Sequence, residues 1–430
     1  MDFMILYESR ARELESACIL KNALKSRGFS VGVYSIYSLM KNIRNAKVII
    51  VPHLYDDKQV FQFICKYKPR RCRVINLQYE QVLSEQGLKA GYGYPQGQAA
   101  NALLLAWGEH EKNRYKGDDK QECKVTGCLA MDLNLPKYDK LYLSKEYLCN
   151  KYRIDTRKKL LVFISSFALA NVTDEYLRLH YKNRFCIMKK FAEISHRSQK
   201  TVIEWLKKIA VEEGWEVVYR PHPAEYENSK LRELEKSLKG FHIIQTESVR
   251  QWIRIADQTV TWFSTSVVDA YYAMKPCIIL RPEKIPEDLD VPFMIDAQSI
   301  CTYDDFVKAI KCDEKSEFPI KATAIGEFYS NERGCECLSS VVSGCIKVYN
   351  SKKYEYKYST PVYYKNIALM FKTFIVDVLF ELSRCFNLTD LYKWLLKNNE
   401  VKKSFFMHVQ KELYKYDKVE KNLYEKIKNE

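Results

Sequence analysis

The residues best suited to chemistry stand in the segment Trp215-Glu-Val-Val-Tyr-Arg-Pro-His-Pro223, where a β-type run ends in a histidine between two prolines. Ligands of open α/β sheets bind at the carboxyl ends of strands, so Arg220 and His222 should lie where a ligand binds. Arginine presents a planar fork to phosphate, and histidine can donate to phosphate or protonate a leaving oxygen. The segment therefore predicts a phosphate-binding loop; the alternative is a structural strand end with a surface histidine.

A second segment, Thr259-Val-Thr-Trp-Phe-Ser-Thr-Ser266, runs from a predicted strand through hydroxyl residues into a predicted helix. The free amides and the dipole at a helix start attract phosphate, and hydroxyl groups add further donors. We predict that Ser264, Thr265 and Ser266 bind a phosphate and that Asp269 accepts hydrogen bonds from ribose hydroxyls. An ordinary helix N-cap is the alternative, since serine and threonine are common there.

Two series of alternating strand and helix patterns would position these loops. The first, residues 1–155, has predicted strands at Phe3–Tyr7, Ser30–Tyr37, Lys47–Val51, Arg73–Leu77, Ala102–Ala106 and Lys124–Thr126. The second, residues 156–345, has predicted strands at Lys159–Ile164, Trp215–Tyr219, Phe241–Gln245, Gln258–Phe263 and Pro276–Leu280. Helical patterns lie between them, including Arg10–Arg27 and Asp174–Glu213. Such alternation is typical of parallel sheets covered by helices, and it predicts an α/β fold with two Rossmann-like domains.

Residues 346–430 form a predicted helical appendage of different character. From about Ser351 onward glycine is absent and aromatic residues are interleaved with lysines. One apolar helix face is predicted by the spacing of Phe371, Phe374, Ile375, Val378, Leu379 and Leu382. This face either packs on the rest of the chain, docks on the inner surface of the cytoplasmic membrane or binds a partner.

Length and composition restrict the class of protein. The chain has 430 residues, 47% hydrophobic content and a formal charge of +15, which suits two domains with an appendage and favours an anionic partner. Its 14 cysteines are scattered, as is typical of reduced thiols in the cytoplasm. The N-terminal run lacks the features of a signal peptide, and no uncharged run is long enough to cross a bilayer. We therefore predict a cytoplasmic protein.

Other chemistries find no support in the sequence. The carboxylate pairs Asp56-Asp57 and Asp118-Asp119 stand in polar segments without a third ligand, so no metal site is predicted. No glycine-rich dinucleotide motif or Walker sequence occurs, and the basic residues are dispersed without a nucleic-acid recognition motif. We predict no metal, no bound cofactor and no nucleic-acid partner.

The order of the motifs resembles that of the bacterial surface-carbohydrate biosynthesis proteins. The matching motifs, spread over residues 1–345, are Tyr7-Glu8-Ser9-Arg10-x-x-Glu13-Leu14, Asn76-Leu77-Gln78-Tyr79-Glu80, Ala106-Trp107-Gly108-Glu109, Val125-Thr126-Gly127, Phe163-Ile-Ser-Ser-Phe-Ala-Leu-Ala-Asn171, Arg220-Pro-His-Pro223 and Ser264-Thr265-Ser266. More distantly the chain is similar to CDP-glycerol glycerophosphotransferases, capsule Kdo transferases and bacterial sialyltransferases. These resemblances imply a GT-B fold with a cleft between two domains, a nucleotide-activated donor and metal-independent catalysis.

The resemblance also implies roles for individual residues. His222 and the Ser264–Ser266 turn would face the donor phosphate, and Asp269 would lie near the ribose. Relatives often carry an Asp-Glu-Glu-Gly-like segment where this chain has Gln78-Tyr79-Glu80-Gln81, which leaves Glu80 as the first candidate for the base that deprotonates an acceptor hydroxyl. Glu8 is the second candidate. A surface or salt-bridged glutamate is the alternative at both positions.

Three functions are compatible with these features. The first is a glycosyltransferase, or a glycerophosphotransferase-like enzyme, that moves a group from a donor, with a preference for CMP or CDP, to a bacterial surface polysaccharide such as capsule or lipopolysaccharide. The acceptor would be a glycan or a lipid-linked glycan. The second is a nucleotide-sugar epimerase of the UDP-GlcNAc 2-epimerase type. The third is a non-catalytic subunit that binds a nucleotide sugar or a glycan.

Overall fold

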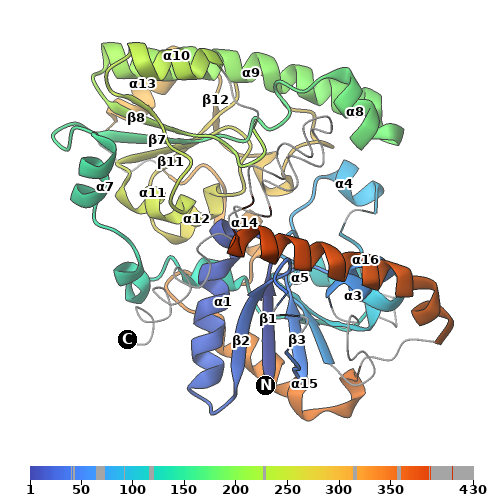
Figure 1. Ribbon diagram of the computed structural model, residues 1–430. Helices are drawn as coiled ribbons and strands as arrows, with labels where there is room; N and C mark the ends of the chain where they lie inside the picture. Colours follow the sequence, from blue (N-terminus) through green and yellow to red (C-terminus); the bar gives the residue numbers. More distant parts are fainter. Residues whose placement is uncertain are drawn as a thin grey trace. The chain divides into compact units, whose positions relative to one another are not determined.

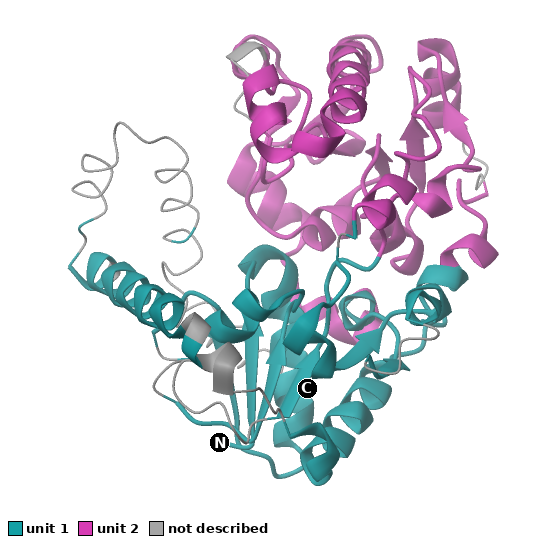
Figure 2. Cartoon of the chain, turned by 90° about the vertical axis from the view of Figure 1, so that its right-hand side faces the viewer, with its two compact units in different colours: residues 1–81, 91–133, 326–430 teal, residues 82–90, 134–325 magenta. Residues whose placement is uncertain are grey.

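Two six-stranded sheets, parallel throughout, organise the chain in a computed structural model. The structure describes residues 1–39, 41, 44–63, 73–91, 93–115, 121–225, 229–312, 317–355, 360–386, 388 and 409. The chain separates into unit 1, residues 1–81, 91–133 and 326–430, and unit 2, residues 82–90 and 134–325 (Figure 2). Each unit holds one sheet, which confirms the prediction of an α/β fold with two Rossmann-like domains.

The sheet of unit 1 has the strand order β2-β1-β3-β4-β5-β6. Figure 1 labels β2, β1 and β3 side by side in this order. Its strands are β1 (Phe3–Tyr7), β2 (Val31–Ser35), β3 (Val48–Val51), β4 (Arg73–Asn76), β5 (Leu103–Ala106) and β6 (Cys123–Val125), which confirms the six strands predicted for the first domain. The chain first adds β2 on one side of β1 and then β3 on the other. The order therefore reverses between β1 and β3, and ligands of such sheets bind at this switch point.

Continuous apolar runs in β1, β3 and β5 explain why these strands are buried on both faces of the sheet. Met4 packs in a cluster with Phe61, from a helix on one face, whereas the neighbouring Phe3 ring lies 5.4 Å from the ring of Tyr349 on the other. The helices of unit 1 are α1 (Arg10–Lys25), α3 (Asp57–Phe63), η1 (Gly97–Asn101), α5 (Glu109–Arg114), α6 (Leu129–Asp132), α15 (Leu338–Asn350), η5 (Lys352–Tyr354) and α16 (Thr360–Cys385). The predicted helix Arg10–Arg27 is confirmed as α1.

The sheet of unit 2 has the strand order β12-β11-β10-β7-β8-β9. Its strands are β7 (Leu160–Ile164), β8 (Glu216–Arg220), β9 (Phe241–Ile243), β10 (Gln258–Thr261), β11 (Cys277–Leu280) and β12 (Ser299–Ile300). The five strands predicted for the second domain are confirmed. The two-residue β12 was not predicted, because it is too short to carry a pattern. Here the order reverses between β7 and β10.

Helices cover both faces of the second sheet as well. They are α4 (Glu85–Lys89), η2 (Pro136–Leu141), α7 (Lys145–Tyr152), α8 (Asp174–His180), η3 (Lys182–Arg184), α9 (Phe185–Glu212), α10 (Ser229–Ser237), α11 (Val249–Ile255), α12 (Val267–Tyr272), η4 (Pro292–Met294) and α13 (Tyr303–Lys311), with α14 (Ala322–Phe328) at the boundary of the two units. The fully buried ring of Trp262 stacks on Phe167 at 4.6 Å in the core. Helix α12 begins directly after the Ser264–Ser266 turn, as predicted.

The units divide the chain differently from the predicted boundaries at residues 155 and 345. Residues 134–155 belong to unit 2, and residues 326–345 return to unit 1. The buried carboxylate of Asp132 explains the return, because it accepts hydrogen bonds from the main-chain N–H groups of Cys337 and Leu338 at the start of α15 (both 2.9 Å). A side chain in α6 therefore caps a helix that begins more than 200 residues later.

Helix α16 represents the predicted appendage, most of whose remaining residues lie outside the described part of the chain. A buried ion pair joins Lys41 Nζ to Asp377 Oδ2 at 2.8 Å, and Met370 belongs to the core cluster of unit 1. The predicted apolar face is not the one that packs, since Phe371 and Ile375 are 64% and 56% exposed. In the described part of the chain, no helix is long and apolar enough to cross a membrane.

Candidate functional site

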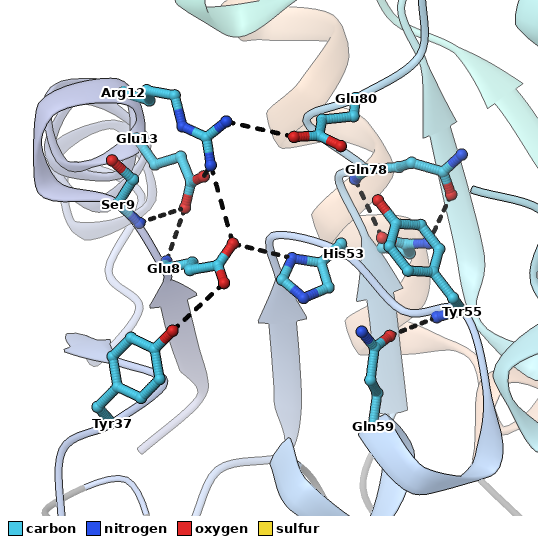
Figure 3. Close-up of polar contacts among 11 residues, drawn as sticks. Glu8, Ser9, Arg12, Glu13, Tyr37, His53, Tyr55, Gln59, Gln78 and Glu80 are labelled. Carbon is cyan, nitrogen blue, oxygen red and sulfur yellow. Dashed lines mark hydrogen bonds and ion pairs between the residues drawn. The ribbon is translucent and has the colours of Figure 1, made fainter. Parts of the chain in front are cut away.

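A cavity of about 310 Å³ lies at the carboxyl edge of the unit 1 sheet (Figure 3). Its lining comes from the segments that follow β1, β3 and β4, so it stands at the switch point of the sheet. The lining residues are Glu8, Arg12, Glu13, Pro52, His53, Tyr55, Gln59, Tyr79 and Glu80. The two glutamates predicted as candidate bases, Glu8 and Glu80, therefore line the same cavity.

The Arg12 guanidinium lies among three carboxylates of this cavity. Its nitrogens are 3.3 Å from Glu80, 3.6 Å from Glu13 and 3.8 Å from Glu8. Burial lowers the pKa of Arg12, but the negative charges of the three glutamates outweigh burial and raise the pKa above its ordinary value. The arginine thereby holds the two candidate bases in one charge network, and Glu8 also accepts a hydrogen bond from the Tyr37 hydroxyl at 3.3 Å.

Two titratable groups of the cavity differ in environment from Glu8 and Glu80. Glu13 is 2% exposed, and burial raises its pKa to about 7, although it accepts main-chain hydrogen bonds from Glu8 (2.7 Å) and Ser9 (3.2 Å). Burial also lowers the pKa of His53, whose Nδ1 lies 3.8 Å from Glu8 Oε2. The cavity therefore holds groups that can release and groups that can take up a proton near neutral pH.

The position of Glu80 depends on a left-handed turn two residues earlier. Gln78 has a φ of +43°, a conformation that is unusual for residues other than glycine. Its fully buried side chain donates to the Gly93 carbonyl at 2.9 Å and to Glu111 Oε1 at 2.8 Å, which secures the turn. The chain leaves β4 at this turn and brings Tyr79 and Glu80 to the cavity.

In unit 2, the loop after β7 joins the two motifs that predicted phosphate binding. The Ser165 hydroxyl donates to Glu225 Oε2 at 2.5 Å, in the loop that carries His222. The Ser166 hydroxyl accepts from the Phe263 main-chain N–H at 3.1 Å, directly before the Ser264–Ser266 turn. Both motifs therefore meet at the switch point between β7 and β10.

Glu225 fixes the loop that presents His222. Its carboxylate accepts from the Tyr219 hydroxyl (2.7 Å), from Gln199 Nε2 (3.0 Å) and from the main-chain N–H of His222 (3.1 Å). His222 is exposed, and its Nδ1 accepts from the Ala224 N–H at 3.1 Å. A neutral imidazole with this hydrogen bond carries its proton on Nε2, which makes Nε2 the donor.

Arg220 has a different environment from the one expected of a phosphate ligand. Its guanidinium is buried and donates to the main-chain carbonyls of Thr246 (2.8 Å) and Glu247 (2.9 Å), and burial lowers its pKa to about 10. The arginine thus fixes the loop between β9 and α11, in which Glu247 has a φ of +63°. Contact between Arg220 and a phosphate stays a prediction that none of these hydrogen bonds supports.

The remaining predicted donor residues surround the start of α12. The Ser264 hydroxyl accepts from the Ser266 N–H at 3.2 Å, and Thr265 is exposed. Asp269 is buried, and its Oδ1 lies 2.8 Å from Arg250 Nε. Its carboxylate is therefore engaged inside unit 2, so the predicted contact with a ribose also stays a prediction.

Sequence reasoning missed four residues of these sites. Arg12 follows Glu8 at i+4 spacing, and Glu13 is its neighbour. His53 stands two residues after β3, so the rule applied to Arg220 and His222 would have found it. Glu225 follows His222 by three residues, a spacing that suits a side chain bonding back to a loop N–H. Its other partners come from distant segments and carry no local signal.

No metal site was predicted, and the carboxylates of Asp56 and Asp57 accept hydrogen bonds from main-chain N–H groups. Asp56 accepts from the Gln59 N–H at 2.8 Å, and Asp57 accepts from the Gln98 N–H at 2.7 Å. Asp118 and Asp119 lie outside the described residues. Among the residues that the structure describes, no group of three His, Cys, Asp or Glu side chains is arranged to hold a metal ion.

Comparison with solved structures supports the fold. The chain is similar to UDP-GlcNAc 2-epimerase from Methanocaldococcus jannaschii in complex with UDP-GlcNAc and UDP, with 13% identity, a TM-score of 0.50, and 80% of this chain and 100% of that chain covered. A protein from Listeria monocytogenes described as a UDP-N-acetylglucosamine 2-epimerase gives 14% identity and a TM-score of 0.50, with 83% of this chain and 99% of that chain covered. The wall teichoic acid polymerase TagF gives 10% identity and a TM-score of 0.49, with 80% and 88% covered.

The two structures with a TM-score of 0.50 show that the chain has a two-domain α/β fold of the GT-B type. At identities of this size they show the fold alone. No family model and no curated protein sequence matches the chain.

Proposed function

We propose that the chain is an enzyme that acts on a nucleotide-activated sugar or polyol and transfers the activated group to a bacterial surface glycan. The observation that carries the proposal is the meeting of the Arg220–Pro223 and Ser264–Ser266 motifs at the switch point of the unit 2 sheet, joined by Ser165 and Ser166. The exposed side chains of His222 and Thr265, with the half-buried hydroxyls of Ser264 and Ser266, suit a phosphate. The resemblance of the motifs to those of CDP-glycerol glycerophosphotransferases, capsule Kdo transferases and bacterial sialyltransferases favours a cytidine nucleotide.

In this proposal the donor phosphate binds beside His222, and the acceptor group binds in the cavity of unit 1. The acceptor oxygen attacks the carbon or phosphorus atom that joins the transferred group to the nucleotide. The bond from that atom to the leaving phosphate oxygen breaks, and the nucleotide leaves with the electron pair. His222 stabilises the negative charge that develops on the phosphate, and the acceptor proton passes to Glu80 or Glu8.

A second candidate is epimerisation of a nucleotide sugar. The observation that favours it is the cluster of proton-exchanging groups in one cavity, since Glu13 and His53 accompany Glu8 and Glu80. An epimerase moves protons on a single substrate and needs no acceptor. The solved structures of the same fold include epimerases that act on UDP-GlcNAc.

Product analysis separates the candidates. The full chain is incubated with CMP-, CDP- and UDP-linked sugars and with CDP-glycerol, with and without a glycan acceptor, and the products are separated by mass spectrometry and NMR. Product that needs the acceptor supports transfer, and an epimerised nucleotide sugar without acceptor supports the second candidate. Binding of nucleotide without turnover in either assay would favour the non-catalytic subunit.

The same assay tests the proposal that catalysis needs no divalent metal. We expect activity in EDTA to equal that in magnesium, because His222 and the hydroxyl residues offset the phosphate charge. Activity that disappears with EDTA and returns with magnesium would contradict this part of the proposal. Attachment to the membrane surface through α16 likewise remains a proposal, which rests on the exposed Phe371 and Ile375.

A further inference from the structure

The cavity of unit 1 carries more negative than positive side-chain charge. Three carboxylates line it, those of Glu8, Glu13 and Glu80, and Arg12 is the one arginine or lysine among the described lining residues. The side chains of Glu8 and Glu80 are 30% and 41% exposed, so both carboxylates reach the open part of the cavity. Even without the buried Glu13, two carboxylates face one guanidinium.

Arg12 offers little attraction to a further anion, because the three carboxylates already surround its guanidinium. The distances of 3.3, 3.6 and 3.8 Å to Glu80, Glu13 and Glu8 leave its charge shared among them. A phosphate or carboxylate that approached Arg12 would also approach these glutamates. Juxtaposed like charges are a strong source of discrimination between ligands.

His53 does not reverse this balance. Burial lowers its pKa, Arg12 acts in the same direction, and the opposing influence of Glu8 and Glu80 is too small to cancel the effect. The imidazole is therefore neutral at neutral pH. It stacks on the Tyr55 ring at 5.3 Å with an interplanar angle of 20°.

The other lining groups suit a neutral polar ligand. Tyr55 and Tyr79 contribute aromatic rings and hydroxyls, and Gln59 contributes an amide. Carboxylates accept hydrogen bonds from hydroxyl groups, so several glutamates in one cavity match a ligand that carries several hydroxyls. A cavity of about 310 Å³ is large enough for one sugar ring.

We propose that the cavity of unit 1 binds a hydroxyl-rich group without negative charge, a neutral or amino sugar, and excludes phosphorylated or carboxylated sugars. The inference rests on the proposed function in one respect, because the proposed function identifies the sugar bound in this cavity as part of the acceptor. If it holds, the acceptor end that reacts is not a glycerol phosphate unit, a uronic acid or a sialic acid.

Ligand-observed NMR titrations of the full chain test the inference directly. The probes are a methyl hexoside, a methyl 2-amino-2-deoxyhexoside, a methyl hexuronide and a methyl hexoside 6-phosphate. We expect the neutral and amino glycosides to bind about tenfold or more tightly than the two anionic glycosides. Equal or tighter binding of either anionic glycoside, or no binding of the neutral and amino glycosides, would overturn the proposal.

A double variant, Glu8→Gln with Glu80→Gln, then tests whether these carboxylates cause the selectivity. We expect the ratio of neutral to anionic affinity to fall toward one, and the matched control Glu204→Gln, on the exposed side of α9, to keep the wild-type ratio. An unchanged ratio of neutral to anionic affinity in the double variant would show that other residues cause the selectivity, and it would contradict the inference.

Nucleotide titrations of the same samples keep the two proposals apart. If neutral glycosides bind selectively but no nucleotide binds, the proposed function fails and the cavity inference stands. If nucleotides bind but anionic glycosides are preferred, the cavity inference fails and the donor side of the proposed function stands.

Discussion

The carboxylate of Glu225 accepts four hydrogen bonds that together hold the His222 loop. The donors are the Ser165 hydroxyl, the Tyr219 hydroxyl, the Gln199 amide and the His222 main-chain N–H. Glu225 therefore fixes the loop of the histidine proposed to face the donor phosphate. Since Tyr219 is fully buried, a change at Glu225 would also leave a buried hydroxyl without this partner.

Replacing Glu225 by glutamine tests this arrangement. The amide retains one acceptor oxygen in place of two, so we expect the free energy of unfolding to fall by about 1–3 kcal/mol and nucleotide affinity to fall roughly tenfold. Urea denaturation and isothermal titration calorimetry measure the two effects. Wild-type nucleotide affinity in the variant would show that the loop is held by other contacts.

The buried carboxyl of Glu13 predicts a pH dependence of stability. Its pKa is raised from the ordinary 4.5 to about 7. Between these values the folded chain keeps a proton that the unfolded chain has lost, so the free energy of unfolding falls as the pH rises from 4.5 to 7. The change is about 3 kcal/mol, and it is complete above the folded-state pKa.

The variant Glu13→Gln should lack this slope, because the amide does not titrate. Urea denaturation between pH 5 and pH 8 compares the variant with wild type, and Glu204→Gln serves as the control. An identical slope in wild type and Glu13→Gln would show that Glu13 is not the titrating group.

Sequence reasoning found His222 because the end of a strand marks it, and it found Glu80 and Glu8 through the family resemblance. It missed residues that depend on distant partners. The engagement of Arg220 with the loop before α11, and of Asp269 with Arg250, follows from packing between segments that no local pattern connects.

The positions of the strands were predicted correctly, whereas the face of α16 that packs on unit 1 was not. The eleven predicted strands are confirmed. The fully buried ones among them, such as β1, β3 and β7, carry the continuous apolar runs that reveal them. In α16 the apolar face lies exposed, and the helix is held by the buried pair of Lys41 and Asp377. A charged residue can lie on the packing face of a helix when a distant residue pairs with it. The spacing of apolar residues along the helix does not reveal that partner.

The cap of α15 can be tested by the substitutions Asp132→Asn and Asp132→Ala. Asparagine keeps one acceptor oxygen, whereas alanine leaves the N–H groups of Cys337 and Leu338 without their partner. We expect the free energy of unfolding to fall by about 0.5–2 kcal/mol for alanine and by less for asparagine. Urea denaturation supplies the values, and hydrogen exchange of α15 amides should increase in the same order. Equal stability of all three proteins would contradict the capping role.

The chain as a whole places its candidate sites by the same topological rule in both units. Each sheet reverses its strand order once, between β1 and β3 in unit 1 and between β7 and β10 in unit 2. The glutamate-lined cavity stands at the first switch point, and the two predicted phosphate motifs meet at the second. The return of residues 326–345 to unit 1 is accompanied by the long-range contact between Asp132 and the start of α15.

The central claim is that unit 2 binds the phosphate of a nucleotide through the His222 loop. Isothermal titration calorimetry of the full chain with CMP, CDP, UDP and GDP tests it, with His222→Ala as the variant and His180→Ala, an exposed histidine of α8, as the matched control. We expect at least one of these nucleotides to bind wild type and the control alike, and His222→Ala to bind it about tenfold more weakly. Absence of binding by all four nucleotides, or equal binding by His222→Ala, would contradict the account.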